Sequence, residues 1–371
     1  MDQVIAFRRH LHRHPELSFR EEATRDYILT RLCEAGIEAR IVARTGVLAT
    51  IRGRHTAPEE RRAVVLRADI DALPIDEQSG LEYASENAGV MHACGHDMHA
   101  AVLYGVLCRL AANPDFEGTI FGLFQPGEEC NPGGASQVLS EHPFDGYDIR
   151  AVVGEHCEWQ LEVGQIGLKG GKYMASSDEL HFTVRGRGGH GAMRHLLIDP
   201  VVAAAELITR LVALNSEEQV LSMGLVRSEG ATNVIPDSVT LAGTLRTFDE
   251  ANRQALHRQI EEIASTIDRT HGTTIEVEIN HGYPAVVNDE RLVEAARCEV
   301  EALGYEATRE ERRPLAEDFG YYTLHYPALF YRLGVGRESG RSHTATYAPS
   351  EEALPVGVRL MERLAKKLIQ R

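Results

Sequence analysis

The sequence is short of cysteine, tryptophan, long apolar runs and positive charge. Its six cysteines are too sparse and irregular for a disulfide framework, so most are expected to be buried thiols. No uncharged apolar stretch approaches the roughly 20 residues that cross a bilayer. The N-terminal segment is interrupted by Arg and His, unlike an export signal. We therefore expect a cytoplasmic protein without a membrane-spanning segment.

Acidic residues dominate the charge, with 55 Asp plus Glu against 39 Lys plus Arg and a net charge of −16 at pH 7. A surface of this sign repels phosphate backbones and anionic lipids, and no segregated basic patch is present. These features exclude nucleic acid and membrane surfaces as expected partners. The 371 residues contain 43% hydrophobic residues, which is typical of a globular chain. At about 150 residues per domain, this length favours two domains.

Apolar spacing predicts an α/β domain built from both ends of the chain. Its short, uniformly apolar runs fit strands buried on both faces of a parallel or mixed sheet. The predicted elements are helices at 4–11, 23–35, 98–112 and 290–303, and strands at 63–66, 119–124, 151–153 and 328–333.

The middle of the chain follows a different order. After the glycine-rich stretch 164–171, the predicted elements are strands at 180–186, 220–228, 239–248 and 274–279, and helices at 199–214 and 250–270. This βαββαβ order is the ferredoxin-like arrangement. We therefore predict a mixed-sheet catalytic domain at 1–174 and 282–371, interrupted by an inserted ferredoxin-like domain at 175–281.

The densest cluster of potential ligands is HACGHDMH, residues 92–99, in which Cys94 and His96 lie between an extended segment and a helix. Sulfur and imidazole at this density favour a transition metal. A buried thiol beside a capping histidine is the competing interpretation. Asp69 and Asp71, which follow the strand at 63–66, are candidates to orient a ligand histidine. A strand-end turn explains these two aspartates equally well.

A second group follows the strand at 119–124, where Glu128 and Glu129 are adjacent in QPGEE. Neighbouring residues in extended backbone point in different directions, so one can bind a metal while the other faces a metal-bound water. A solvated surface turn is the alternative, but the NPGG loop that follows suits close packing around a site. His156 and His343 each follow an apolar run, and singly each reads as structural. Their shared position at strand carboxyl ends is where open α/β sheets place sites.

A series of motifs resembles the M20 metallopeptidase superfamily, in particular the branch of hippurate hydrolases, N-acetyl-amino-acid deacetylases and auxin-conjugate amidohydrolases. The motifs, in chain order, are HRHPELSFREEAT, RADIDALPI, HACGHDMHAA, QPGEE, GRGGHGAMRH, NVIPDSVTLAGTLRTF, AEDFGYY and HTATYAPSEEAL. The resemblance covers almost the whole chain. It implies a catalytic α/β domain with an inserted ferredoxin-like lid, which is the usual homodimer interface.

The resemblance also implies the roles of individual residues. A site for two divalent transition-metal ions, Zn, Mn, Co or Ni, would have as its ligands Cys94, His96, Glu129, His156 and His343. Glu128 would be the general base that deprotonates the metal-activated water.

The resemblance assigns three further residues to the lid. His190 resembles the histidine that reaches the partner subunit's site and stabilises the oxyanion. Asn233 and Arg246 resemble polar residues that bind the substrate, where an arginine fork can hold a carboxylate. Without the resemblance, Arg246 would read as an ordinary exposed strand residue.

The chain departs from the family pattern at Glu155 and Glu158 around His156, at Arg194 in place of Pro, and at Cys130 in place of Gly. We hypothesise that the two extra carboxylates favour a substrate with a cationic side chain or a free amine, such as an acetylated diamino acid. The alternative is that both face solvent or are paired internally.

The sequence therefore predicts a metal-dependent amidohydrolase that cleaves the amide bond of a small-molecule N-acyl-amino acid. A dipeptidase or carboxypeptidase of the same superfamily is the first alternative. A non-catalytic metal-binding or ligand-sensing relative is the second, disfavoured because Glu128 has no evident structural task. The acyl group, the amino-acid side chain and the physiological metal are not encoded in these motifs.

Overall fold

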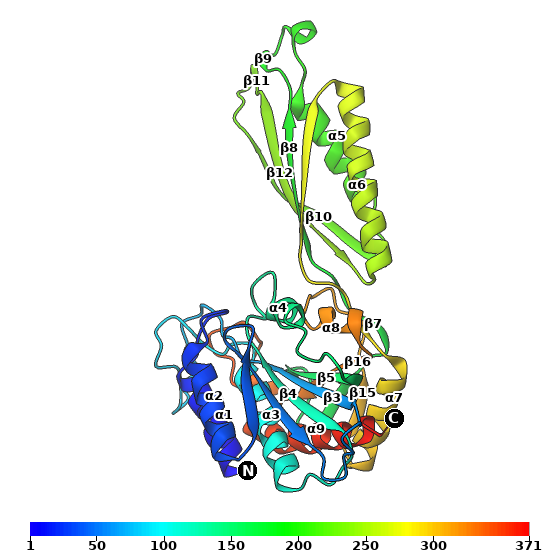
Figure 1. The fold of residues 1–371 in the computed structure, drawn as a ribbon. Helices are drawn as coiled ribbons and strands as arrows, with labels where there is room; N and C mark the ends of the chain where they lie inside the picture. The colour runs from blue at the N-terminus through cyan, green and yellow to red at the C-terminus, as the bar shows by residue number, and fades with distance from the viewer. Residues whose placement is uncertain (371) are drawn as a thin grey trace. The chain divides into compact units, whose positions relative to one another are not determined.

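The structure is a computed structural model that describes residues 1–370. The chain forms two compact units (Figure 1). The first consists of residues 1–171, 287–311 and 321–371, and the second of residues 172–286 and 312–320. The limits 175–281 that the sequence indicates for a lid stay a prediction.

The first unit is built on an eight-stranded sheet in the order β1-β2-β4-β3-β5-β16-β6-β15. Its strands are β1 (Glu38–Val42), β2 (Gly46–Arg52), β3 (Arg62–Asp69), β4 (Thr119–Gln125), β5 (Asp148–Glu158), β6 (Gln165–Leu168), β15 (Glu306–Arg309) and β16 (Ala328–Gly334). The central strands β4, β3, β5 and β16 are parallel, and β1 and β2 pair antiparallel with their neighbours. Strand β6 pairs antiparallel with β16 and parallel with β15. The sheet is therefore mixed, which confirms the prediction.

Helices cover this sheet, and one large apolar core lies between the sheet and helices α1, α3, α7 and α9 (Figure 1). The helices are α1 (Asp2–Arg13), α2 (Glu22–Glu34), α3 (His96–Ala112), α4 (Gly134–Ser140), α7 (Glu290–Ala302), α8 (Gly320–His325) and α9 (Leu354–Leu368). Helix α3 begins two residues earlier than predicted, because Gly95 takes a left-handed conformation (φ 89°) at its N-cap. That start places His96 in the first turn.

Strand β5 is longer than the predicted run 151–153, because its last residues continue to pair with β16 as far as Glu158. His156 therefore lies within its strand near the carboxyl end, rather than directly after the strand. Ala151, Val153 and Cys157 point into the apolar core. Since side chains alternate along a strand, His156 points to the opposite face.

The second unit has the predicted βαββαβ order and a sheet in the order β10-β12-β8-β13. Its elements are β8 (Asp178–Arg185), α5 (Pro200–Val212), β10 (Gln219–Ser228), β12 (Ser238–Thr247), α6 (Glu250–His271) and β13 (Thr274–His281). Asp199 and Asp249 accept backbone N–H bonds at the starts of the two helices, and Gly272 ends α6 in a left-handed conformation. The two helices cover one face of the sheet around a separate apolar core (Figure 1). The ferredoxin-like prediction is confirmed.

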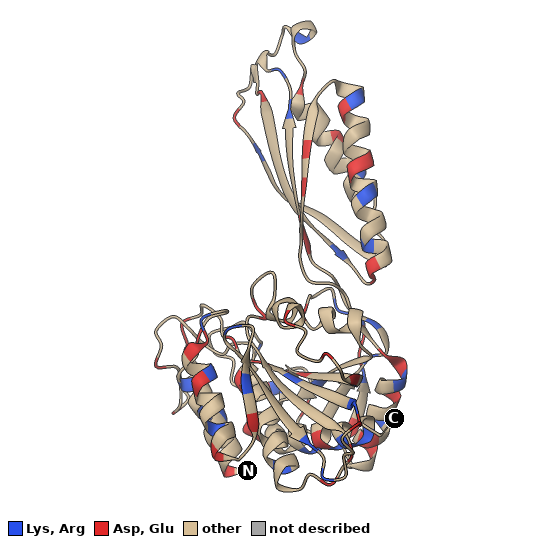
Figure 2. Cartoon of the chain, in the orientation of Figure 1, with Lys and Arg blue, Asp and Glu red and all other residues tan. Residues whose placement is uncertain are grey.

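Shorter elements complete the fold. Strands β9 (Gly189–His190) and β11 (Val234–Ile235) pair with each other in the second unit, and β7 (Gly171–Met174) and β14 (Val286–Asn288) lie where the chain passes between the units. Acidic and basic residues are interspersed along the surface helices (Figure 2). Within residues 1–370, none of the helices is both long and apolar enough to span a membrane.

The prediction that most cysteines are buried thiols is wrong. Cys33, Cys130 and Cys298 are exposed, and only Cys94 and Cys157 are fully buried. The exposed thiols lie on helix surfaces or in a loop. At such positions, apolar neighbours in the sequence do not indicate that the cysteine itself is buried.

Candidate metal centre

The start of α3 carries two of the candidate ligands. Cys94 lies in the turn before the helix and His96 is its first residue. Gly95 between them packs closely: a Cβ atom at this position would lie 3.2 Å from Sγ of Cys157. Glycine is therefore required both for the left-handed turn and for the approach of the helix to the end of β5.

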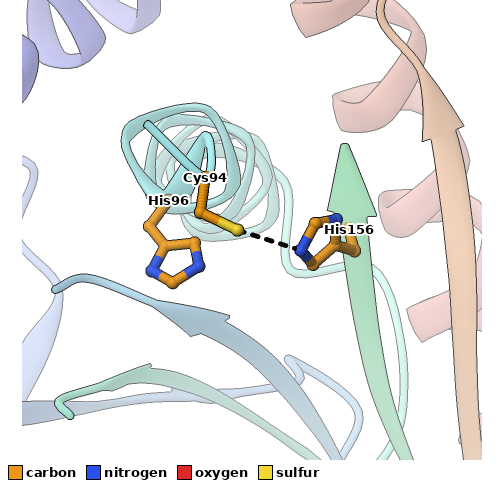
Figure 3. A group of neighbouring side chains, drawn as sticks. All are labelled: Cys94, His96 and His156. Carbon is orange, nitrogen blue, oxygen red and sulfur yellow. Dashed lines mark hydrogen bonds between the residues drawn. The ribbon is translucent and has the colours of Figure 1, made fainter. Parts of the chain in front are cut away.

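The five predicted ligands come together in the first unit. Sγ of Cys94 lies 3.3 Å from Nε2 of His156 and 3.3 Å from Nε2 of His343. Oε1 of Glu129 lies 3.2 Å from Nε2 of His343 and 4.0 Å from Nε2 of His96. Figure 3 shows Cys94 and His156 facing each other from the helix start and from β5, with His96 beside them.

This donor set fits divalent transition metals. Its atoms form two overlapping groups, Cys94 with His96 and His156, and Cys94 with Glu129 and His343. Within residues 1–370, Nε2 of His96 and Oε1 of Glu129 are buried without a hydrogen-bond partner, as expected for atoms aimed at a cation. One sulfur, three imidazoles and a carboxylate suit Zn, Mn, Co or Ni better than Mg or Ca.

Asp71 orients two of these ligands. Its Oδ1 lies 3.2 Å from Nδ1 of His96, whose ring also meets the Asp71 carbonyl oxygen at 2.9 Å. Its Oδ2 accepts the backbone N–H of Glu129 at 2.9 Å and the hydroxyl of Ser18 at 2.7 Å. Asp71 thus has the position predicted for a carboxylate that orients a ligand histidine.

The surroundings shift the pKa values of His96 and His156 in opposite directions. Burial alone would lower the pKa of His96, but Asp69 and Asp71 outweigh it and raise that pKa to about 10. Burial, followed by the charge of Arg332, lowers the pKa of His156 well below its usual range, so this ring is neutral and ready to bind a cation.

Burial and the nearby carboxylates of Glu129 and Glu128 raise the pKa of the Cys94 thiol well above its usual range. A bound divalent cation reverses this effect, because a coordinating thiol is deprotonated. Glu128 is only 7% exposed, and its carboxylate lies within 4.8 Å of ligand atoms of His96 and Glu129. The base predicted from the paired glutamates is therefore next to the candidate ligands.

The structure favours the alternative to the hypothesis that Glu155 and Glu158 attract a cationic substrate. Glu155 faces the core side of β5, where it accepts a 2.7 Å hydrogen bond from the hydroxyl of Tyr331. Burial raises the pKa of Glu155 to about 8, so it is largely uncharged at pH 7. Glu158 is also buried and accepts the backbone N–H of Gln160. The internal pairing that was the alternative is the observed arrangement.

The three predicted lid residues lie in the second unit. His190 ends β9 and pairs with Val234 of β11, which places Asn233 next to it in the adjoining turn. Nδ1 of His190 accepts the backbone N–H of Ala192 at 3.2 Å. Arg246 lies on β12 opposite Val220 of β10, and burial lowers the pKa of its guanidinium.

His99 belongs to the same motif as Cys94 and His96 but is not among the predicted site residues. Its Nδ1 lies 2.6 Å from Oδ1 of Asp69, and its Nε2 lies 2.8 Å from the backbone nitrogen of Cys157. The available signal was its spacing of three from His96, which places both rings on one helix face.

Sulfur, imidazole and carboxylate groups cluster beside a further carboxylate at the carboxyl edge of an α/β sheet. This arrangement is the site of a metal-dependent hydrolase. Comparison with known proteins agrees. The model of peptidase family M20/M25/M40 matches residues 65–367, so the chain belongs to this family, and the resemblance in the sequence is confirmed.

Individual relatives are similar over most of their length. An N-acetyl-L-cysteine deacetylase of Bacillus subtilis (strain 168) is 36% identical, over 99% of this chain and 88% of the relative. An N-acyl-L-amino acid amidohydrolase of Geobacillus stearothermophilus is 41% identical, over 77% of this chain and 78% of the relative. A Bacillus subtilis crystal structure described as a dinuclear metal binding peptidase of the M20 family has a TM-score of 0.88 at 36% identity, covering 100% of this chain and 98% of that one. The site is accordingly one for divalent metal ions.

Proposed function

We propose that this protein is a metal-dependent amidohydrolase that releases a free amino acid from an N-acyl-amino acid. The observation that carries the proposal is the convergence of Cys94 and the other four candidate ligands beside Glu128. The deacetylase and amidohydrolase relatives support the choice of N-acyl-amino acids as substrates.

The donor set would hold two cations, one in each of its two overlapping groups, with Cys94 common to both. When bound, divalent cations would polarise the amide carbonyl and lower the pKa of a water molecule at the site. The dinuclear relative supports this count, and the sulfur and imidazole donors support Zn, Mn, Co or Ni.

Glu128 performs the proton transfers. Its carboxylate accepts a proton from the attacking water as the new C–O bond forms, and it delivers that proton to the amine nitrogen as the C–N bond breaks. The partial burial of Glu128 keeps bulk water from competing for this proton. The products are a carboxylic acid and an amino acid.

His190 is suited to stabilise the oxyanion. Because its Nδ1 accepts the N–H of Ala192, the proton of the neutral ring is on Nε2. The side chain is exposed, so this N–H can donate to a substrate oxygen.

Arg246 is suited to bind the carboxylate of the amino-acid half. It is half-buried, and within the described residues its guanidinium makes neither a hydrogen bond nor an ion pair. A partly desolvated, unpaired fork binds a carboxylate strongly. Asn233, held beside His190 by the N–H of Gly191, would supply a further polar contact to the substrate.

The sheet of the second unit supports a homodimer. Strand β10 is an edge of this sheet and exposes Val220, Leu225 and Val226, the last of them 62% exposed. An exposed apolar edge strand pairs readily with a second copy. We expect a cytoplasmic homodimer that a Val226→Lys substitution converts to monomers in light-scattering measurements, whereas cell fractionation would test the location.

A dipeptidase reading has less support, because a free substrate amine requires an acidic partner. Glu155 is largely neutral and faces away from His156, and Glu158 is paired internally. Turnover of a dipeptide beside its N-acetyl analogue separates the two activities.

The proposal is tested by supplying Zn, Mn, Co and Ni in turn to the chelator-treated protein with N-acetyl-leucine, N-acetyl-cysteine, hippurate, N-acetyl-ornithine and N-acetyl-diaminopimelate. We expect metal-dependent release of the amino acid, and a loss of about 10²- to 10⁴-fold in kcat in Glu128→Gln with unchanged metal content. Absence of turnover for every substrate with metal bound would leave a non-catalytic metal-binding protein.

A further inference from the structure

His99 is a fully buried histidine that the proposed reaction does not use. Its Nε2 lies 2.8 Å from the backbone nitrogen of Cys157. Because a backbone N–H can only donate, Nε2 is an acceptor and the ring proton is on Nδ1. That proton is donated to Oδ1 of Asp69, 2.6 Å away. Both ring nitrogens of His99 are therefore occupied, and its tautomer is set by its partners.

The backbone of Cys157 also contacts the candidate ligand His156 through its carbonyl group. Nδ1 of His156 lies 2.7 Å from the carbonyl oxygen of Cys157, so this nitrogen donates its proton. The other nitrogen, Nε2, is left without a proton and faces Sγ of Cys94 at 3.3 Å. The N–H and the C=O of Cys157 belong to successive peptide units, so the backbone of this one residue connects the ring of His99 to the orientation of the ligand ring.

Asp69 is itself held in place. Its second oxygen, Oδ2, accepts a 2.6 Å hydrogen bond from Arg67, and both side chains are fully buried. A buried carboxylate held by a guanidinium on one oxygen and by an imidazole on the other has little freedom to rotate. The hydrogen bonds thus run in order from Asp69 to His99, to Cys157 and to His156.

We propose that His99 is a positioning residue that sets the orientation of His156 through the backbone of Cys157. The inference rests on the proposed metal centre. Removal of the acceptor at Nε2 leaves the buried N–H of Cys157 without a partner, which favours rotation of the peptide unit between His156 and Cys157. That rotation changes the backbone dihedral angles at His156 and Cys157, so the carbonyl of Cys157 no longer holds the ring of His156 in a fixed direction.

Two substitutions separate the two nitrogens of His99. In His99→Gln, the amide oxygen reaches the position of Nε2 and can accept the N–H of Cys157. In His99→Asn, the shorter amide reaches only the position of Nδ1, next to Asp69. His92→Gln is the matched control, because His92 belongs to the same motif and is buried, yet neither of its ring nitrogens has a partner within residues 1–370.

Affinity for Zn²⁺ and Co²⁺ is measured by competition with a chromophoric chelator, together with the bound stoichiometry and the Co²⁺ absorption spectrum. We expect His99→Asn to bind one of two cations about 10- to 100-fold more weakly than the unsubstituted protein, with an altered Co²⁺ spectrum. His99→Gln and His92→Gln should stay within about threefold of the unsubstituted protein on the same scale. At saturating Co²⁺, His99→Asn should regain most of kcat with an unchanged KM.

Equal affinity in His99→Asn, or equal losses in His99→Asn and His99→Gln, would overturn the inference. If the unsubstituted protein binds no cation, the proposed metal centre itself fails, which is a distinguishable result. If His99→Asn does not fold, ¹⁵N NMR of the unsubstituted protein decides: a neutral ring protonated on Nδ1 supports the inference, and a ring protonated on Nε2 contradicts it.

Discussion

The backbone N–H of Glu129 donates to the carboxylate of Asp71 across 2.9 Å. A carboxylate just after β3 therefore fixes the candidate ligand that follows β4. The opposite oxygen of Asp71 faces the ring of His96. In Asp71→Asn, one of these two faces presents an amide NH₂ group to a donor. We expect metal affinity to fall about 10- to 100-fold, measured by chelator competition. Ser18→Ala, which removes only one hydroxyl from the same carboxylate, is the control and should have a smaller effect.

Glu155 should make the folded protein less stable at alkaline pH. Its pKa is about 8 in the folded state, whereas an unfolded glutamate ionises near 4.5. The unfolded state therefore gains its charge first, and stability from this group decreases as pH rises from about 4.5 to about 8. In Glu155→Gln this decrease should be absent. The difference in unfolding free energy between the two chelator-treated proteins should change by a few kcal/mol, on the order of 4, across this range in urea titrations.

The same substitution also tests the role of Glu155 in substrate choice. Because Glu155 faces Tyr331 rather than the site, Glu155→Gln should leave the ratio of kcat/KM for N-acetyl-ornithine and N-acetyl-leucine unchanged. A selective loss for N-acetyl-ornithine would restore the hypothesis that Glu155 recognises a cationic substrate.

His12 should contribute stability that is also lost as pH rises, but over a more alkaline range than for Glu155. Its Nδ1 lies 2.9 Å from Asp97 and its Nε2 lies 3.1 Å from Glu77. Burial opposes ionisation of this ring, but Asp97 and Glu77 raise its pKa from 6.5 to about 9. The contribution is therefore full below about pH 6.5 and is lost as pH rises through about 9. We expect the advantage over His12→Gln to shrink by roughly 3 kcal/mol between these limits. An advantage that stays constant with pH would show that the His12 ring does not titrate.

Arg246 should govern recognition of the substrate carboxylate. Arg246→Ala should raise KM for N-acetyl-leucine about 10- to 100-fold, the value of one or two charge-assisted hydrogen bonds. N-acetyl-leucinamide, which has no carboxylate, should be affected far less. Arg185→Ala is a suitable control, because Arg185 lies in the same sheet but is exposed and paired with Glu276.

The sequence was informative wherever one residue type or one spacing decides the outcome. The dense motif around Cys94 and the strand-end pair at Glu128 pointed to a metal site, and apolar spacing located β3, β4 and α3. The edge strands β1 and β15 were missed, because exposed strands at a sheet edge lack an apolar run. Helix α9 was missed although its apolar residues recur at helical spacing.

The side on which each residue of β5 lies could not be predicted. It depends on the pairing of β5 with β16, which is more than 150 residues away in the chain. That pairing extends the strand past His156, turns Glu155 toward Tyr331 and brings the Cys157 peptide to His99. Local sequence patterns do not record such contacts, so they could not predict that Glu155 faces Tyr331.

The backbone at His343 differs from that of the other candidate ligands. Cys94 and His96 are attached to the buried start of α3, whereas His343 lies in a loop at φ 61°, with its side chain 51% exposed and its N–H bonded to Ala93. A left-handed conformation at a residue with a Cβ atom is costly and persists only while its contacts hold. Demetallation should accordingly be stepwise, with the ion beside His343 exchanging with solvent first and a half-loaded protein accumulating before the apoprotein.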